Sequence, residues 1–324
     1  MDLSFQKIIT YMDFLSSKYG KQIEILNSTI WENRVQGPKI IEWLDNFDDD
    51  HEKNYALYML SRLMYFSSSS IRNLLKALYR DLYRYPIIEQ IRKDNNNTLD
   101  PYIIEPFFNK ELMATRFLGV GNPSESGVHL LYYFRQENKI PKNLFINTDD
   151  VVEYDENGNC KLRDSYKDVK HYVFIDDLCG SGTQATSNDS NVKRCVQHLR
   201  NIVKDAEISY FMIFGMSKGI KVIRDSGLYN RANAVVELDE SYRCFSEQSR
   251  FFDDDKYKRS EAKDIAYKHG YKLLQSHKHS LGFGDCQLLL SMHHNTPDNT
   301  LPIIWYDEDN SIWKPIFKRY NKVY

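Results

Sequence analysis

From residue 99 onward, short apolar runs of strand length alternate with stretches that have helical spacing. We expect strands at 117–120, 144–146, 172–175, 208–214, 234–238 and 287–291. We expect helices at 129–137, 192–203 and 218–225. A strand that returns parallel to its neighbour needs a crossover, which is usually a helix. The alternation therefore predicts an α/β fold in which a mostly parallel sheet is flanked by helices.

The first part of the chain reads as helical. Serines at 67–70 offer N-cap oxygens to a helix whose apolar residues run at helical spacing from Ile71 to Leu82, and Pro86 is expected to end it. The acidic segment 45–52 is expected to be a solvated turn. The polar segment 94–98 is expected to separate a helical domain, 1–98, from an α/β domain with a C-terminal extension, 99–324.

A basic stripe lies along the helix that starts near residue 71. Arg72, Lys76, Arg80 and Arg84 are spaced four residues apart, so they share one helix face. Such a stripe could contact nucleic-acid phosphates, as a recognition helix does. The other interpretation, which we favour, is a solvated helix face or a surface that meets an acidic partner protein.

Charge and composition exclude several classes of protein. The net charge of −2 gives no general attraction to nucleic acid or to an anionic membrane, so any nucleic-acid contact must be local. The five cysteines are scattered without a CxxC pair, which is typical of reduced thiols in the cytoplasm. No apolar run approaches the roughly 20 residues of a membrane span, and the N-terminus lacks the pattern of a signal peptide. We expect a cytoplasmic protein without a membrane partner.

The segment HYVFIDDLCGSGTQAT, which starts at residue 171, carries the clearest chemistry. Its apolar run suits a buried central strand, and Asp176 and Asp177 follow at the carboxyl end, where α/β sheets bind ligands. The loop Gly180–Thr183 offers backbone N–H groups and hydroxyls to a phosphate. Adjacent carboxylates suit sugar hydroxyls or Mg²⁺. Together they predict a site for a ribose 5-phosphate; the alternative is a tight turn in which an Asp caps a helix.

Other phosphate motifs do not fit this segment. A Walker A loop requires a lysine after its glycines, and none follows here. The G-x-G-x-x-G pattern of dinucleotide-binding proteins is also absent. The haloacid-dehalogenase motif separates its two aspartates by one residue, whereas Asp176 and Asp177 are adjacent.

The segment resembles the phosphoribosyl pyrophosphate motif of type I phosphoribosyltransferases, which has four apolar residues, two acids and a Thr/Gly-rich loop. The resemblance implies that Asp176 and Asp177 hold the ribose 2′- and 3′-hydroxyls and act with Mg²⁺. It implies that the 5′-phosphate is wrapped by Leu178, Cys179, Gly180, Ser181, Gly182, Thr183 and Gln184. Aligned without a gap, Thr183 and Gln184 replace the closing glycine and threonine of the family's loop; aligned on the final Gly-Thr, the loop is one residue shorter. Either departure is compatible with phosphate binding and fits a loss of turnover.

A second segment, GNPSESG, follows an expected strand and precedes an expected helix. In type I phosphoribosyltransferases, the early loop in this place holds the pyrophosphate. The resemblance assigns that role to Gly121, Asn122, Ser124, Glu125, Ser126 and Gly127. Glu125 suits a pyrophosphate only if it points away or reaches Mg²⁺. By itself, the segment could equally be an ordinary turn.

The resemblance extends to segments outside these loops, namely WENRVQGPKIIEWLDNF, CFSEQSRFF and SLGFGDCQLLLSMHHNTPDNTLPIIW. These are similar to a subgroup of phosphoribosyltransferase-like proteins of bacterial conflict systems, which have a winged-helix-like amino-terminal region. Some members accompany reverse transcriptases in retron antiphage cassettes. The resemblance implies an antiphage effector that transfers phosphoribose to a nucleobase, a nucleotide or a nucleic acid. The alternative is a non-catalytic sensor of a nucleotide or phosphoribosyl ligand that contacts nucleic acid, a reverse transcriptase complex or another partner.

Other polar residues carry weaker hypotheses. His277, His279 and the pair at 293–294 lack cysteine or carboxylate partners at metal-binding spacing, so we interpret them as structural or surface histidines. Arg243 and Arg250 could clamp a pyrophosphate, although a surface role fits equally well.

Overall fold

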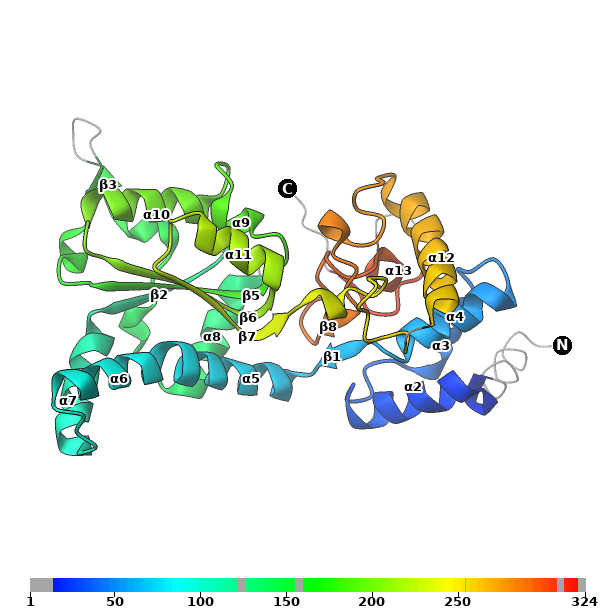
Figure 1. The fold of residues 1–324 in the computed structure, drawn as a ribbon, viewed down its shortest axis with the longest axis horizontal. Helices are drawn as coiled ribbons and strands as arrows, with labels where there is room; N and C mark the ends of the chain where they lie inside the picture. The colour runs from blue at the N-terminus through cyan, green and yellow to red at the C-terminus, as the bar shows by residue number, and fades with distance from the viewer. Residues whose placement is uncertain (1–13, 122–125, 155–159, 254, 308–311, 320–324) are drawn as a thin grey trace. The chain divides into compact units, whose positions relative to one another are not determined.

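The computed structural model describes residues 14–121, 126–154, 160–253, 255–307 and 312–319 (Figure 1). The chain divides into two compact units. Unit 1 comprises the chain up to Ile71 together with everything from Asp239 onward, and unit 2 is Arg72–Leu238. The expected boundary at 94–98 lies inside unit 2, so the compact units and the expected domains divide the chain at different places.

Unit 2 contains a four-stranded sheet, and all of its strands run parallel. The strand order is β2 (Thr115–Gly119), β5 (His171–Cys179), β6 (Glu207–Met216) and β7 (Arg231–Leu238). Phe117 pairs with Val173, and Val173 pairs with Ser209. Strands β5 and β6 are buried almost throughout because helices cover both faces of the sheet. The predicted α/β fold with a mostly parallel sheet is confirmed.

Two groups of helices cover the sheet (Figure 1). On one face, α9 (Thr183–Thr186), α10 (Asn191–Ile202) and α11 (Ser217–Asp225) bury their apolar residues against Tyr172 and Phe174. On the other, Phe134 of α8 (Ser126–Asn138) packs on Phe117, with the ring centroids 5.4 Å apart. Successive side chains along each strand point to opposite faces of the sheet, so each strand contributes to both layers.

The helical region before the sheet is longer than expected. Helix α5 (Ser68–Ala77) continues as the π-helix η1 (Leu78–Arg84) and then as α6 (Tyr85–Asp94). The prediction that Pro86 ends the helix is wrong. The α-type hydrogen bonds of α5 stop at the π-helix, and a new helix, α6, begins after it. Pro86 lies in the first turn of α6, where a backbone N–H has no partner within the helix, so the missing N–H of proline costs no hydrogen bond.

The rest of unit 2 is short elements around the sheet. Helix α7 (Pro101–Met113) follows the polar segment 94–98, and β3 (Val152–Tyr154) pairs antiparallel with β4 (Cys160–Leu162). The expected strand at 144–146 is reduced to a single parallel bridge between Phe145 and Phe117, after the 3₁₀ turn η2 (Lys142–Leu144). Two further 3₁₀ turns are η3 (Thr148–Asp150) and η4 (Asp164–Tyr166).

Unit 1 joins the two ends of the described chain in one apolar core. Its amino-terminal elements are α2 (Lys18–Thr29), α3 (Gly37–Leu44), α4 (Asp50–Leu60) and β1 (Met64–Phe66). Its carboxy-terminal elements are η5 (Glu240–Tyr242), α12 (Lys256–Leu274), η6 (Phe283–Asp285), β8 (Leu290–Met292) and α13 (Pro302–Trp305). Strand β1 pairs parallel with β8, and the Trp43 indole donates to the Ile303 carbonyl at 2.7 Å. The winged-helix-like arrangement expected for the amino-terminal region stays a prediction.

Within the described residues, no helix is both long and apolar enough to cross a membrane.

Candidate functional site

The acid pair, Asp176 and Asp177, lies at the carboxyl end of the sheet in unit 2. Strand β2 ends where Gly119 pairs with Ile175, and the chain then leaves the sheet at Gly121, which has a φ of 99°. Strands β5 and β6 continue beyond that point, so Asp176 still pairs with Met212. The sequence predicts that the acids come just after the strand, whereas the structure places them inside β5, near its carboxyl end and beyond the end of β2.

Asp176 is an interior carboxyl group, only 3 % exposed. Its Oδ2 accepts a hydrogen bond from the Tyr210 hydroxyl at 2.6 Å, and its Oδ1 accepts from the Asp177 N–H at 2.9 Å. Burial raises the pKa of Asp176 well above the usual carboxylate range, and the charge of Asp177 raises it further. The bond from Tyr210 acts in the opposite direction. The sequence does not anticipate this degree of burial.

Asp177 is slightly more accessible, at 8 %. Its Oδ1 accepts a hydrogen bond from the Leu178 N–H at 2.8 Å. The charge of Asp177 raises the pKa of Asp176, as expected for carboxyl groups on adjacent residues. Two neighbouring carboxyl groups are best stabilised by a hard cation such as Mg²⁺ or by hydroxyl donors, so the residue types fit both ligands proposed from the sequence.

The predicted phosphate loop is shorter than the sequence suggests. Leu178 and Cys179 are buried strand residues that pair with β6. The turn proper is Gly180–Gly182, and Thr183 and Gln184 are exposed at the start of α9. The Ser181 and Thr183 hydroxyls are 2.7 Å apart, so two hydroxyls gather at the turn.

Glycines shape this turn. Gly182 has a φ of 80°, a left-handed conformation that disfavours other residues. A Cβ on Gly182 would lie 2.9 Å from the Gly219 carbonyl oxygen in α11. The loop therefore rests directly on the backbone at the start of α11, and its conformation depends on that contact.

A buried tyrosine pair lies beneath the loop. The rings of Tyr210 and Tyr229 pack edge to face with centroids 5.3 Å apart. The Tyr229 hydroxyl donates to the Ala185 carbonyl at 2.9 Å, which ties α9 to the segment before β7. Tyr210 was missed as a site residue because it appears in the sequence as one more apolar residue of a buried strand.

The early loop is described only in part. Gly121 lies two residues after the end of β2, and Ser126 and Gly127 are the first residues of α8. Asn122, Ser124 and Glu125 lie outside the described residues. Helix α8 packs on β2 and β5, so the two predicted ligand loops leave neighbouring strands at the same edge of the sheet.

The basic stripe is paired with acids of the same chain. Arg72 and Lys76 both contact Glu137, at 2.7 and 2.9 Å. Arg80 pairs with Asp81 at 2.6 Å and Arg84 with Glu105 at 2.8 Å. The hydrogen bond from Lys76, followed by that from Arg72, lowers the pKa of Glu137. These ion pairs agree with the solvated-face interpretation of the stripe.

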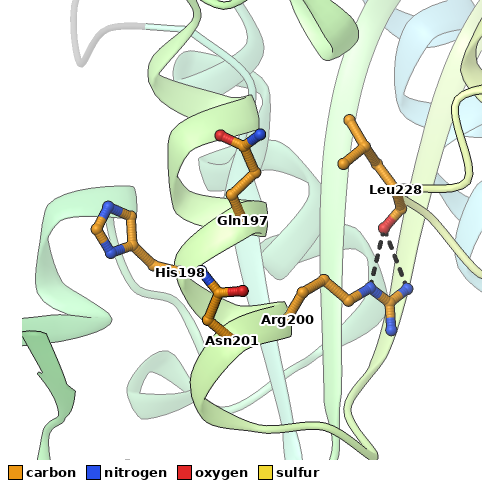
Figure 2. Close-up of a pocket in the computed structure, with 5 residues that line it drawn as sticks. All are labelled: Gln197, His198, Arg200, Asn201 and Leu228. Atoms are coloured by element: carbon orange, nitrogen blue, oxygen red, sulfur yellow. Dashed lines mark hydrogen bonds between the residues drawn. The ribbon is translucent and has the colours of Figure 1, made fainter.

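A surface pocket lies on α10, away from the acid pair (Figure 2). Its volume is about 410 Å³, and it is lined by Gln197, His198, Arg200, Asn201 and Leu228. Arg200 reaches across to the Leu228 carbonyl, at 3.1 and 3.0 Å from its Nε and Nη2. Since α10 ends just before β6 and Leu228 just precedes β7, the pocket is at the amino edge of the sheet. It is therefore separate from the predicted ligand site.

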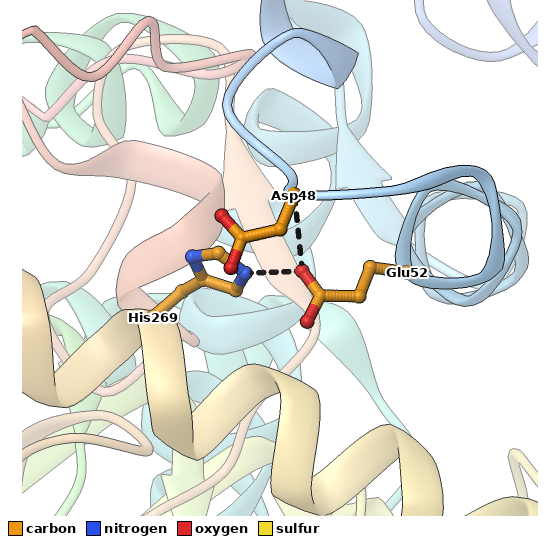
Figure 3. Close-up of side chains that lie close together, drawn as sticks. All are labelled: Asp48, Glu52 and His269. Carbon is orange, nitrogen blue, oxygen red and sulfur yellow. Dashed lines mark hydrogen bonds and ion pairs between the residues drawn. The ribbon is translucent and has the colours of Figure 1, made fainter.

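Unit 1 contains a cluster of Asp48, Glu52 and His269 whose donor atoms lie within 4.8 Å of one another (Figure 3). Their residue types could ligate a metal, but the Lys268 ammonium is 2.6 Å from both carboxylates and already supplies a cation. His269 hydrogen-bonds Glu52 at 2.6 Å. The expectation that 45–52 is a wholly solvated turn is wrong for Glu52, which is buried because α12 packs over it.

The remaining arginine hypotheses concern unit 1. Arg243 contacts Glu240 and holds Asp285 at 2.7 Å, while Arg250 lies over the Tyr242 ring, 3.5 Å from its centroid. Both therefore take part in local packing within that unit.

The comparisons with known proteins identify the family of the chain. The model of the PRTase-CE family matches residues 40–319, a range that includes the acid pair and most of both units. No curated protein matches the chain. Since the matched range is most of the 324 residues, the chain belongs to the PRTase-CE family and is a phosphoribosyltransferase-like protein.

Proposed function

We propose that the protein binds 5-phosphoribosyl pyrophosphate with Mg²⁺ at the acid pair and transfers the phosphoribosyl group to an acceptor. The observation that carries the proposal is the convergence of Asp176, Asp177 and the glycine turn at one edge of a parallel sheet. Ligands of open α/β sheets bind at this edge. The family supports a phosphoribosyl or nucleotide substrate.

Different residues of the site would bind different parts of the ligand. The acid pair meets the ribose hydroxyls, and bound Mg²⁺ supplies positive charge to the pyrophosphate. The Gly180–Gly182 turn, with the Ser181 and Thr183 hydroxyls, meets the 5′-phosphate. The early loop that begins at Gly121 meets the pyrophosphate.

The transfer breaks the bond between C1′ and the pyrophosphate oxygen, and the electron pair leaves with pyrophosphate. A new bond forms from C1′ to a nucleophilic atom of the acceptor, which loses its proton to solvent. The protein's task is to position C1′ and to stabilise the charge of the leaving group. We propose a nucleobase, a nucleotide or a nucleic acid as the acceptor, and an antiphage effector as the biological role.

The experiment is pyrophosphate release from labelled phosphoribosyl pyrophosphate, with and without Mg²⁺, in the presence of mixed nucleobases, nucleotides and nucleic acid. Wild-type protein should release pyrophosphate, and the double variant Asp176→Ala/Asp177→Ala should not. Gln197→Ala, in the pocket at the far edge of the sheet, is the matched control and should behave as wild type. Failure of the wild type to bind the ligand contradicts the proposal.

A second candidate function is a non-catalytic sensor. It is favoured by the burial of Asp176 and by the departure of Thr183 and Gln184 from the family's loop. In that case the winged-helix-like amino-terminal region, with Arg72, Lys76, Arg80 and Arg84, contacts nucleic acid or a reverse transcriptase complex. Tight ligand binding without pyrophosphate release supports the sensor over the enzyme.

A further inference from the structure

The two members of the acid pair have different surroundings. Both carboxylate oxygens of Asp176 accept hydrogen bonds from the protein itself, one from the Tyr210 hydroxyl and one from the Asp177 N–H. Its side chain is 3 % exposed, against 8 % for Asp177. Because Asp176 is almost fully buried, it offers little surface to a ligand, and moving its carboxyl group out of the interior would break both bonds, which is unfavourable.

Tyr210 is held firmly where it meets Asp176. It lies on β6 beside β5, is 1 % exposed, and packs its ring on Tyr229. A buried tyrosine hydroxyl needs a hydrogen-bond partner, and Asp176 Oδ2 at 2.6 Å is that partner. The position of the Asp176 carboxyl group is therefore set from the neighbouring strand.

Asp176 in turn holds the backbone of its neighbour. Its Oδ1 accepts the N–H of Asp177, whose own Oδ1 accepts the N–H of Leu178. Side chain and backbone thus form a continuous series of hydrogen bonds from Tyr210 to Leu178, two residues before the turn begins. Such a series fixes the direction in which the Asp177 carboxylate leaves the strand.

We propose that Asp176 is a positioning residue anchored by Tyr210, and that Asp177 is the acid that meets the ribose hydroxyls or their Mg²⁺. The inference rests on the proposed function and deepens it, because it assigns different roles to two residues that the sequence treats as equal. Tyr210 becomes a second positioning residue of the same site.

Matched substitutions at the two acids test the assignment. In Asp176→Asn, Oδ1 still accepts from the Asp177 N–H, and Nδ2 can donate to the Tyr210 oxygen, so ligand affinity should stay within about threefold of wild type. In Asp177→Asn, the charge-assisted bonds to the ligand are lost, and affinity should fall about 30-fold or more. Asp176→Ala should bind the ligand more weakly than wild type, because alanine cannot make these hydrogen bonds. Asparagine should therefore preserve ligand affinity at position 176 but not at position 177.

The readout is binding of ribose 5-phosphate and of 2-deoxyribose 5-phosphate, each measured with Mg²⁺ by calorimetry on the full chain. The ratio of the two affinities reports contact with the 2′-hydroxyl and does not change when a variant is merely less stable. We expect this ratio to fall to about one in Asp177→Asn, to fall partly in Tyr210→Phe, and to be kept in Asp176→Asn.

Tyr229→Phe is the control for the loss of a buried hydroxyl in the same aromatic stack, because its hydroxyl bonds to Ala185 instead of the acid pair. It should leave the ratio unchanged. Equal losses in Asp176→Asn and Asp177→Asn overturn the division of roles while the proposed function stands. If the ratio of the two affinities is the same in Tyr210→Phe as in Tyr229→Phe, Tyr210 does not position Asp176 for ligand binding. If wild type binds neither sugar phosphate nor phosphoribosyl pyrophosphate, the proposed function and this inference both fail.

Discussion

Gly219, at the start of α11, packs so closely on Gly180 that any Cβ there would overlap the Gly180 carbonyl oxygen. The contact is reciprocal, because a Cβ on Gly182 would press against the Gly219 carbonyl. Helix α11 and the turn after β5 therefore meet through close backbone contact, although they are distant in the sequence.

Gly219→Ala should displace this turn. The overlapping atom is backbone, so the loop or α11 must shift, which should destabilise the protein by about 1–3 kcal/mol. We expect affinity for Mg²⁺ and phosphoribosyl pyrophosphate to fall at least about tenfold, since positioned groups tolerate little displacement. Denaturant unfolding and calorimetry measure the two effects.

Gly227→Ala is the matched control. Gly227 has a φ of 66° and nothing within 4 Å of its Cβ position, so alanine there suffers backbone strain of about 1–2 kcal/mol without touching the loop. Its ligand affinity should equal that of wild type. Unchanged affinity in Gly219→Ala would count against the loop as a ligand site.

Neutralising the basic stripe should change nucleic-acid binding very little. The variant replaces Arg72, Lys76, Arg80 and Arg84 by glutamine. Each cation already has a carboxylate partner in the chain, so little of its charge is available to phosphates. Such exposed pairs contribute little to stability.

Affinity for single-stranded and duplex nucleic acid, measured across a salt series, checks this. A true phosphate contact would reduce the slope of log K against log salt by about 0.7–0.9 per contact. A shallower slope in the variant would support the sensor hypothesis and contradict the solvated-face interpretation.

Glu52 should make the stability of the protein depend on pH. Burial acts to raise the pKa of Glu52, but hydrogen bonds from Lys268 and His269 outweigh it and lower the pKa. A lowered folded-state pKa contributes stability above the unfolded value, about 4.3, and the contribution is lost as pH falls through the folded value. Glu52→Gln should therefore be less stable than wild type at pH 7, by about 1–3 kcal/mol.

That difference should shrink as pH falls below the unfolded value, about 4.3, and through the lowered folded-state pKa of Glu52. Asp50→Asn, in the same first turn of α4 but with a fully exposed side chain, is the control and should show little difference at either pH. A Glu52→Gln deficit that is the same at pH 3 and pH 7 would show that packing, and not the ion pairs, is responsible.

Cys195 should be chemically inert in the folded protein. Burial raises the pKa of this α10 thiol to about 12, so almost no thiolate is present at pH 8. Iodoacetamide should label it only after unfolding, as judged by peptide mass spectrometry. A cysteine introduced at the exposed neighbour, Gln197→Cys, should react in the folded state, and comparable labelling of both would disprove the burial argument.

The parallel sheet could be predicted because its central strands are buried on both faces and therefore read as continuous apolar runs, as in 172–175 and 208–214. The helix that continues through Pro86 could not, because the rule that proline ends a helix assumes α-type hydrogen bonding throughout. The π-helix before Pro86 depends on tertiary packing, and the local sequence does not predict it.

The sequence by itself determined the alternation of strands and helices in the parallel sheet, the adjacency of Asp176 and Asp177, and the glycine turn after them, because these depend on neighbouring residues. Tertiary structure decided the pairing of β1 with β8, the burial of Glu52 under α12, and the bond from Tyr210 to Asp176. Each of these joins segments far apart in the chain, and such contacts form only when the whole core packs. Burial and charge pairing are set by that packing, and they give two adjacent, chemically identical acids different environments.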